Sequence, residues 1–196
     1  PIMLSEKDLK QIAQKGITPE QIENQLNEFK TGFPFLKLEA AASIGKGIIA
    51  PEQAGYLAAW EEYKKGEATI VKFVPASGAA SRMFKNLFEY LDNEEKTDFI
   101  AKFENNLDKF AFIDDLKEAI AKNGGDESLK TAIATLLGNE GLSYGNLPKG
   151  LLKFHKYEDG ARTPVEEHLV EGALYASGKN GCVSVHFTVS PEHRPL

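Results

Sequence analysis

The residues of this sequence best suited to chemistry form a run of small side chains that ends in an arginine. The run comprises Ser77, Gly78, Ala79, Ala80, Ser81 and Arg82. Small side chains let backbone N–H groups approach a phosphate, and a helix N-terminus adds about half a positive charge. We place Arg82 in the first helical turn, where its guanidinium can bind two phosphate oxygens. The run predicts a phosphate-binding loop, but a turn with small residues for close packing explains it equally well.

A second segment joins a lysine to a helix start further along the chain. Pro148 and Lys149 come first, and Thr163, Pro164 and Glu166 follow. A threonine cap, a proline at the first helical position and a glutamate three residues after the cap are together typical of a helix N-terminus. This second segment favours the phosphate-binding interpretation of the loop over the interpretation as a packing turn.

Together the two segments resemble the opening of sugar-nucleotide nucleotidyltransferases. The pattern of that family is Gly-x-Gly-Ser/Thr-Arg-Met, then Pro-Lys, then Thr-Pro at a helix start. The resemblance implies a partial Rossmann-like α/β sheet of the GT-A type, with the triphosphate held by residues 77–82. It also implies that Lys149 touches the α-phosphate and the incoming sugar phosphate. An acceptor phosphate would then attack the α-phosphorus of a nucleoside triphosphate and expel pyrophosphate, with Mg²⁺ as cofactor.

The sequence departs from that pattern at two places. Ala80 stands where the second glycine is expected, and an L-residue costs about 1–2 kcal/mol if the position needs a positive φ. Residues 92–146 read as helices where the enzymes keep a short loop. Two alternatives follow. One is a non-catalytic nucleotide-sensing module, and the other is a helical protein-interaction scaffold that works through the insertion.

Nearly the whole chain also resembles the bacterial domain-of-unknown-function 4301 family. The resembling strings are GFPFLKLEAAAS, VKFVPASGAASRMFKNLFE, LPKGLLKFHKYEDGARTPVEEHLVEGALYA and VHFTVSPEH. Members of that family are longer, and no aspartate follows Asp159. We therefore expect this chain to be catalytically incomplete, with the Mg²⁺ ligands outside it. The resemblance also implies a cytoplasmic bacterial protein.

Other chemically suggestive residues are weak candidates. Gly45, Lys46 and Gly47 lack the preceding glycine and the following Ser or Thr of a Walker loop, which favours a surface turn. His186 and His193 lack a defined third ligand, so we predict no metal site in the chain.

The elements that position the two segments alternate between helix and strand. Apolar spacing predicts an N-terminal helical segment at 1–66 that packs on the core. Residues 67–196 are expected to form the N-terminal part of an α/β domain of the nucleotidyltransferase type, with a helical insertion at 92–146. The β-branched run at 69–74 predicts a parallel strand covered on both faces, and 182–189 alternates as a strand with two distinct faces.

Composition narrows the class of protein and its partners. The 196 residues are 42% hydrophobic and 27% charged, which is ordinary for a globular protein. A net charge of −6 without a dense basic block disfavours nucleic acid. The single cysteine, Cys182, excludes an intramolecular disulfide, and no apolar run reaches membrane-spanning length. We expect either a homodimer that covers the open sheet or a chain stabilised mainly by its helices.

Overall fold

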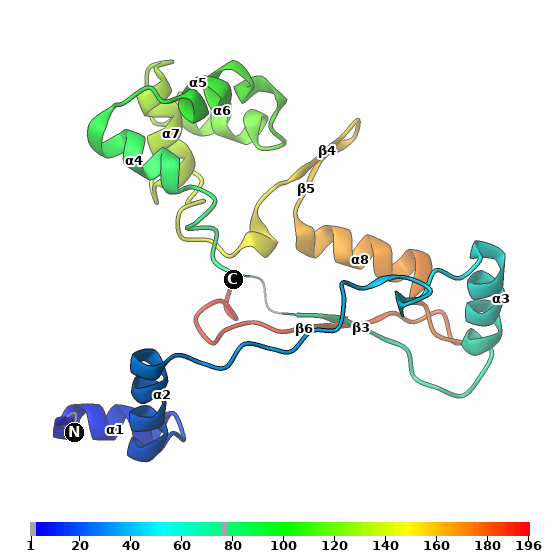
Figure 1. Cartoon of the computed structure of the whole chain (residues 1–196). Coiled ribbons are helices and arrows are strands. Elements are labelled where there is room, and N and C mark those ends of the chain that lie inside the picture. Colours follow the sequence, from blue (N-terminus) through cyan, green and yellow to red (C-terminus); the bar gives the residue numbers. More distant parts are fainter. Residues whose placement is uncertain (1–2, 76–77) are drawn as a thin grey trace. The chain divides into compact units, whose positions relative to one another are not determined.

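The computed structural model describes residues 3–75 and 78–196 of the chain (Figure 1). The chain divides into two compact units, Pro1–Glu52 and Gln53–Leu196. In the described part of the chain, no helix has the length and apolar character needed to cross a bilayer.

The first unit contains two short helices, as its apolar spacing predicts. Helix α1 spans Glu6–Gln14 and helix α2 spans Pro19–Thr31. Both begin with a capping box, and in α2 the Thr18 hydroxyl accepts from the Gln21 N–H while the Gln21 side chain accepts from the Thr18 N–H. These local bonds satisfy N–H groups that a helix leaves unpaired at its start.

The rest of this unit is largely extended. Strands β1, Ser43–Ile44, and β2, Gly47–Ile48, pair around Gly45, whose φ of 80° requires glycine. Phe35 is almost fully exposed, and no described side chain of this unit is buried. The helices of the first unit therefore depend on local bonds and not on a core of their own.

The second unit begins with helix α3, Gln53–Lys64, which lies within the predicted helical segment 1–66. Strand β3, Val71–Val74, then pairs in parallel with β6, Ser184–Phe187. The ladder continues one bond further, where the N–H of Thr188 donates to the carbonyl of Val74 at 3.0 Å. The two strands that the sequence predicts are therefore partners, although they lie far apart along the chain.

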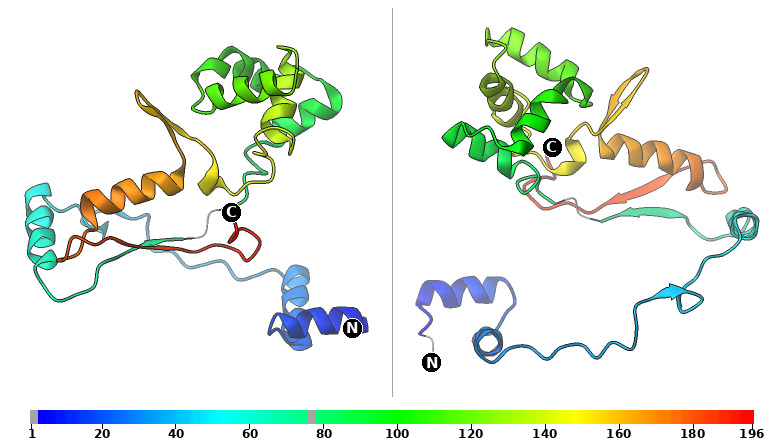
Figure 2. Two further views of the ribbon diagram at one scale, coloured as in Figure 1. Left: turned by 180° about the vertical axis from the view of Figure 1, so that it is seen from behind. Right: turned by 45° about the horizontal axis from the view of Figure 1, so that its top comes forward.

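Helix α8, Pro164–Tyr175, packs along one face of the β3–β6 pair (Figure 2). It begins with the predicted capping box, in which Thr163 and Glu166 exchange hydrogen bonds. Burial alternates along both strands, and Phe73 stays exposed on the face away from α8. The prediction that residues 69–74 are covered on both faces is therefore wrong for the described part of the second unit, because α8 packs on one face and Phe73 on the other face is exposed.

Four helices form a separate hydrophobic cluster within the second unit. They are α4, Lys85–Asn93, α5, Asp98–Asn105, α6, Ile113–Lys122, and α7, Leu129–Leu137, with a 3-10 turn η1 at Leu107–Lys109. The fully buried side chains within these helices are Leu87, Ile100, Leu116, Ile133 and Leu136. The apolar spacing of residues 92–146 predicts most of these helices.

A short hairpin leads from the helical cluster to α8. Strand β4, His155–Tyr157, pairs antiparallel with β5, Gly160–Arg162. Lys153, just before the hairpin, pairs with Asp115 of α6 at 2.6 Å, and its N–H donates to the hydroxyl of Tyr144. These bonds attach the hairpin base to the helical cluster.

Candidate functional site

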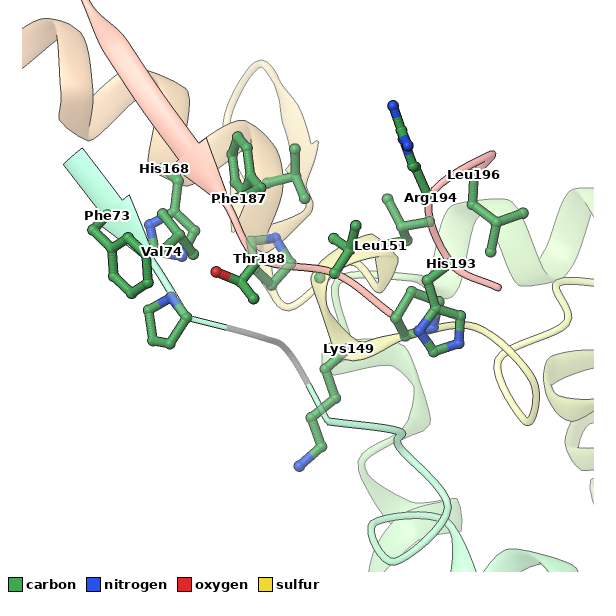
Figure 3. Close-up of a pocket in the computed structure, with 16 residues that line it drawn as sticks. Phe73, Val74, Lys149, Leu151, His168, Phe187, Thr188, His193, Arg194 and Leu196 are labelled. Atoms are coloured by element: carbon green, nitrogen blue, oxygen red, sulfur yellow. The ribbon is translucent and has the colours of Figure 1, made fainter. Parts of the chain in front are cut away.

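A cavity of about 500 Å³ lies at the carboxyl ends of β3 and β6 (Figure 3). The strand ends contribute Val74, Phe187 and Thr188, and the first turn of α8 contributes Pro164 and Val165. The carboxyl ends of parallel strands are the usual ligand position in open α/β sheets. Most of the cavity wall is apolar, which is typical of a pocket that encloses a small molecule.

The ionisable side chains of the cavity that the structure describes are all basic. Lys149, His168, His193 and Arg194 line it, and none of the described lining residues is Asp or Glu. In Figure 3 the Lys149 and Arg194 side chains extend to opposite sides of the cavity. Because the whole chain carries a net charge of −6, this local excess of basic groups favours an anionic ligand.

The structure brings the small-residue loop next to Lys149. Ser77 lies outside the described residues. The carbonyl of Gly78 accepts a hydrogen bond from the N–H of Lys149 at 3.3 Å, and Ala79 forms an antiparallel bridge with Pro148. We call these four residues, Gly78, Ala79, Pro148 and Lys149, the loop–lysine junction. The two segments that carry the sequence resemblance therefore meet in space.

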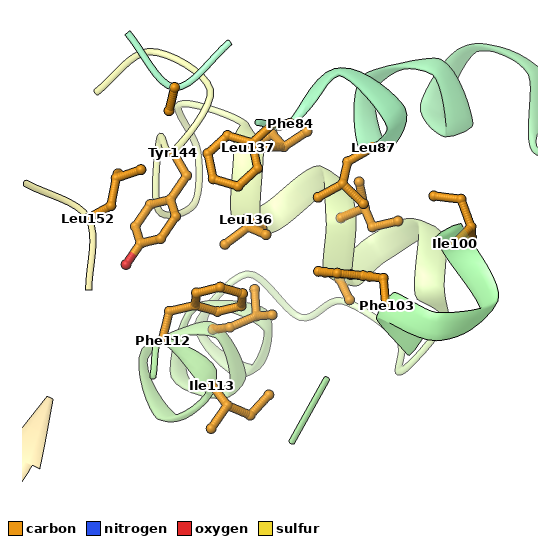
Figure 4. Close-up of a cluster of buried hydrophobic side chains, with 14 residues drawn as sticks. Phe84, Leu87, Ile100, Phe103, Phe112, Ile113, Leu136, Leu137, Tyr144 and Leu152 are labelled. Carbon is orange, nitrogen blue, oxygen red and sulfur yellow. The ribbon is translucent and has the colours of Figure 1, made fainter. Parts of the chain in front are cut away.

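Ala80 has a structural role in this loop. Its side chain is 1% exposed and packs in the hydrophobic core of the helical cluster. The same core contains Tyr144 and Leu152 (Figure 4). Among the described non-glycine residues, only Glu94 and Ser143 have a positive φ. Alanine in place of the second glycine therefore causes no backbone strain at this position.

Ser81 and Arg82 lie in a turn that precedes the helix. The N–H groups of Met83 and Phe84 both donate to the carbonyl of Ala80, and α4 begins only at Lys85. The prediction that Arg82 lies in the first helical turn is therefore wrong, because the Ala80 carbonyl closes a turn first. Arg82 and Ser81 are exposed, and neither lines the cavity.

Each histidine of the cavity has a polar group beside its Nδ1 atom. Nδ1 of His193 lies 3.0 Å from Oγ of Ser190, within hydrogen-bond distance. Nδ1 of His168 lies 3.6 Å from Oε2 of Glu171, and this buried atom has no hydrogen-bond partner in the described part of the chain. In each ring Nε2 is thus the nitrogen that remains for a ligand.

Glu171 connects His168 to Lys72, a largely covered lysine of the sheet. The side chain of Lys72, on β3, is 10% exposed, and its ammonium pairs with the Glu171 carboxylate and lies over the Tyr175 ring. The hydrogen bond from Lys72, followed by the one from Tyr175, lowers the pKa of Glu171. Burial lowers the pKa of Lys72, but its contacts with Glu171 and Tyr175 outweigh burial and raise it overall. Glu171 is therefore ionised at neutral pH.

Sequence reasoning missed most of the cavity residues. Thr188 directly follows the end of β6, and that position is the signal that could have found it. His168 could not be found in this way, because its exposure to the cavity depends on which face of α8 meets the sheet. Arg194 gave no signal in the sequence.

The described residues do not fit a magnesium ion held by the protein. They contain no group of three or more His, Cys, Asp or Glu side chains that could hold a metal. Mg²⁺ prefers one or two carboxylates together with substrate phosphates, and the described cavity lining has no carboxylate. We therefore assign no chemical step to Mg²⁺ here.

Comparison with known proteins gives a family and no activity. No curated protein and no solved structure matches the chain. One family model, described as "Domain of unknown function (DUF4301)", matches residues 5–196. That match covers almost all of the sequence, so the chain belongs to the DUF4301 family.

Proposed function

We propose that the second unit binds a nucleoside triphosphate or a nucleotide sugar. In this proposal the phosphates lie at the loop–lysine junction, and the rest of the ligand enters the cavity. The proposal depends on the hydrogen bond between the Lys149 N–H and the Gly78 carbonyl. This bond joins Lys149 to the small-residue loop, which follows the parallel strand β3. Small residues allow a close approach of phosphate to the main chain.

The charges around the site support this choice of ligand. Lys149 provides a flexible ammonium group that suits a phosphate oxygen, and His168, His193 and Arg194 add basic groups around an apolar wall. The ligand expected from this lining has anionic groups and a less polar body. Nucleotides have both.

The reaction that we propose for this site is nucleotidyl transfer. An acceptor phosphate attacks the α-phosphorus of the nucleotide, the bond to the β-phosphate oxygen breaks, and pyrophosphate leaves. The Lys149 ammonium stabilises the negative charge that develops on the α-phosphate oxygens in the transition state. The resemblance of the loop and of the Pro-Lys segment to the nucleotidyltransferase opening supports this reaction.

Calorimetric titration of the chain with Mg²⁺-UTP, Mg²⁺-ATP and UDP-glucose tests the binding step. Lys149→Met is expected to weaken binding by about 1.5–3 kcal/mol, the usual range for a hydrogen bond to a charged group. Lys156→Met is the matched control, because Lys156 lies in the hairpin, pairs with Asp114 at 3.4 Å and does not line the cavity. Equal loss in both variants, or no binding by the unaltered chain, would contradict the proposal.

Release of pyrophosphate distinguishes an enzyme from a nucleotide-sensing module. The assay combines Mg²⁺-nucleotide with sugar phosphates and measures pyrophosphate directly. Binding without release supports a sensing module, whereas release that Lys149→Met reduces by about 10²–10³ supports transfer. Absence of both favours a scaffold that works through the helical cluster.

A further inference from the structure

We propose that His168 couples ligand binding in the cavity to the uptake of a proton. The inference rests on the proposed function, because it concerns the same cavity and an anionic nucleotide ligand. It adds that the imidazole, Glu171 and Lys72 act together, and that the ligand binds most tightly when His168 is protonated.

The arrangement around His168 leaves room for one more hydrogen bond. Its Nδ1 atom is buried, unpaired within the described residues and 3.6 Å from Oε2 of Glu171. That oxygen already accepts from the ammonium of Lys72 and from the hydroxyl of Tyr175 at 3.1 Å. The carboxylate is therefore fixed in place on one side of the ring, while the cavity lies on another.

The number of donors on an imidazole decides what His168 can do there. A neutral ring has one N–H, so it can donate either to Glu171 or to a ligand, but not to both. A protonated ring donates from both nitrogens, with Nδ1–H to the Glu171 carboxylate and Nε2–H to an anionic ligand. An anionic ligand that accepts from Nε2–H while Glu171 accepts from Nδ1–H therefore binds best to the protonated ring.

His193 provides an internal contrast in the same cavity. Its Nδ1 lies 3.0 Å from the Ser190 hydroxyl, which can donate to it. In that tautomer the neutral ring already carries its proton on Nε2 and can donate to a ligand without an added proton. We therefore assign proton uptake to His168 and not to His193.

Other charged and titratable groups lie near His168 on the elements around it. Lys72 donates to the His168 carbonyl from β3 at 3.4 Å, and Lys149 and Arg194 line the same cavity. Glu167, the preceding residue of α8, pairs with His155 at 3.3 Å and with Arg162 at 3.9 Å. His186 stacks on Phe73, whose side chain is exposed on the face of the sheet away from α8. None of these groups explains proton uptake in the cavity.

Calorimetry with UDP-glucose tests the proposal cleanly. Both phosphates of this nucleotide sugar are diesters, so the ligand itself does not titrate between about pH 5 and 8, where imidazoles exchange protons. Titrations at pH 7 in two buffers of different ionisation enthalpy give the number of protons taken up on binding. We expect net uptake by the unaltered chain, up to about one proton per ligand, with affinity falling up to tenfold per pH unit.

Two matched variants separate the histidines. His168→Gln is expected to abolish the uptake and the pH dependence, and His193→Gln is expected to lower affinity but keep the uptake. Glu171→Gln should reduce the uptake, with circular dichroism to verify its fold. Uptake that persists in His168→Gln, or binding of UDP-glucose without uptake, overturns the inference while leaving the proposed function intact. No binding by the unaltered chain overturns the proposed function itself.

Discussion

The close packing of α8 on the sheet makes Gly172 a sensitive position. A Cβ atom at Gly172 would lie 2.8 Å from Cγ1 of Val183 and 3.4 Å from Cγ2 of Val185. Replacing a helical glycine by alanine ordinarily gains about 1 kcal/mol, whereas overpacking costs about 1–3 kcal/mol. The first contact is shorter than real Cβ contacts allow. We therefore expect Gly172→Ala to lower the free energy of unfolding by about 1 kcal/mol, the middle of that difference.

Urea denaturation of Gly172→Ala beside Gly55→Ala measures this effect. Gly55 lies within α3, and a Cβ there meets no atom within 4 Å, so its substitution should stabilise the chain by up to about 1 kcal/mol. His168 lies one helical turn before Gly172, so a displaced α8 should also weaken UDP-glucose binding. If Gly172→Ala stabilises the chain as much as Gly55→Ala does, α8 does not contact the sheet this closely.

Three further predictions concern the loop and the ion pair between Lys72 and Glu171. Ala80→Gly should lower the free energy of unfolding by about 1–2 kcal/mol, from a lost buried methyl and added backbone freedom, without changing nucleotide affinity; an unchanged melting temperature would contradict the burial of Ala80. Arg82→Ala should leave triphosphate affinity and the fold unchanged, because Arg82 is exposed and lies outside the cavity lining; a loss of about 1.5–3 kcal/mol in calorimetry would show that Arg82 binds the phosphates. The pKa of Glu171 is lower in the folded chain. The ionised Glu171 carboxylate therefore stabilises the fold above the pKa of about 4.3 that it has in the unfolded chain, and this stabilisation is lost as the pH falls through the folded pKa. Glu171→Gln should therefore flatten the acid part of a plot of melting temperature against pH; an acid limb as steep as that of the unaltered chain would contradict this.

Local signals in the sequence predict the helices well. The cap and proline at Thr18 and Thr163 mark the starts of α2 and α8, because capping bonds join residues only three apart. The start of α4 is less predictable, since the turn closed by Ala80 uses small residues that equally suit a helix start. The parallel pairing of β3 with β6 leaves no local signal, because its partners are distant in the chain.

The candidate site is predictable in part. The Pro-Lys segment identifies Lys149, and the structure brings Lys149 and the loop together as the resemblance implies. The burial of Ala80 and the exposure of Arg82 depend on the helical cluster, whose packing the loop sequence does not encode. The proximity of His168 to Glu171 follows from a helical spacing of three, but Lys72, the ion-pair partner of Glu171, comes from β3.

The position of Ala80 and Leu152 in one core has a consequence for folding cooperativity. These residues flank the loop–lysine junction on its two chain segments, and both are buried with the helices of residues 85–137. Opening of the helical cluster would release both segments at once, so the Lys149 amide should exchange its hydrogen only when the cluster opens. The coupling between nucleotide binding at the junction and opening of the helical cluster acts in both directions. A nucleotide bound at the junction would therefore protect the amides of α5, α6 and α7, helices that it never touches.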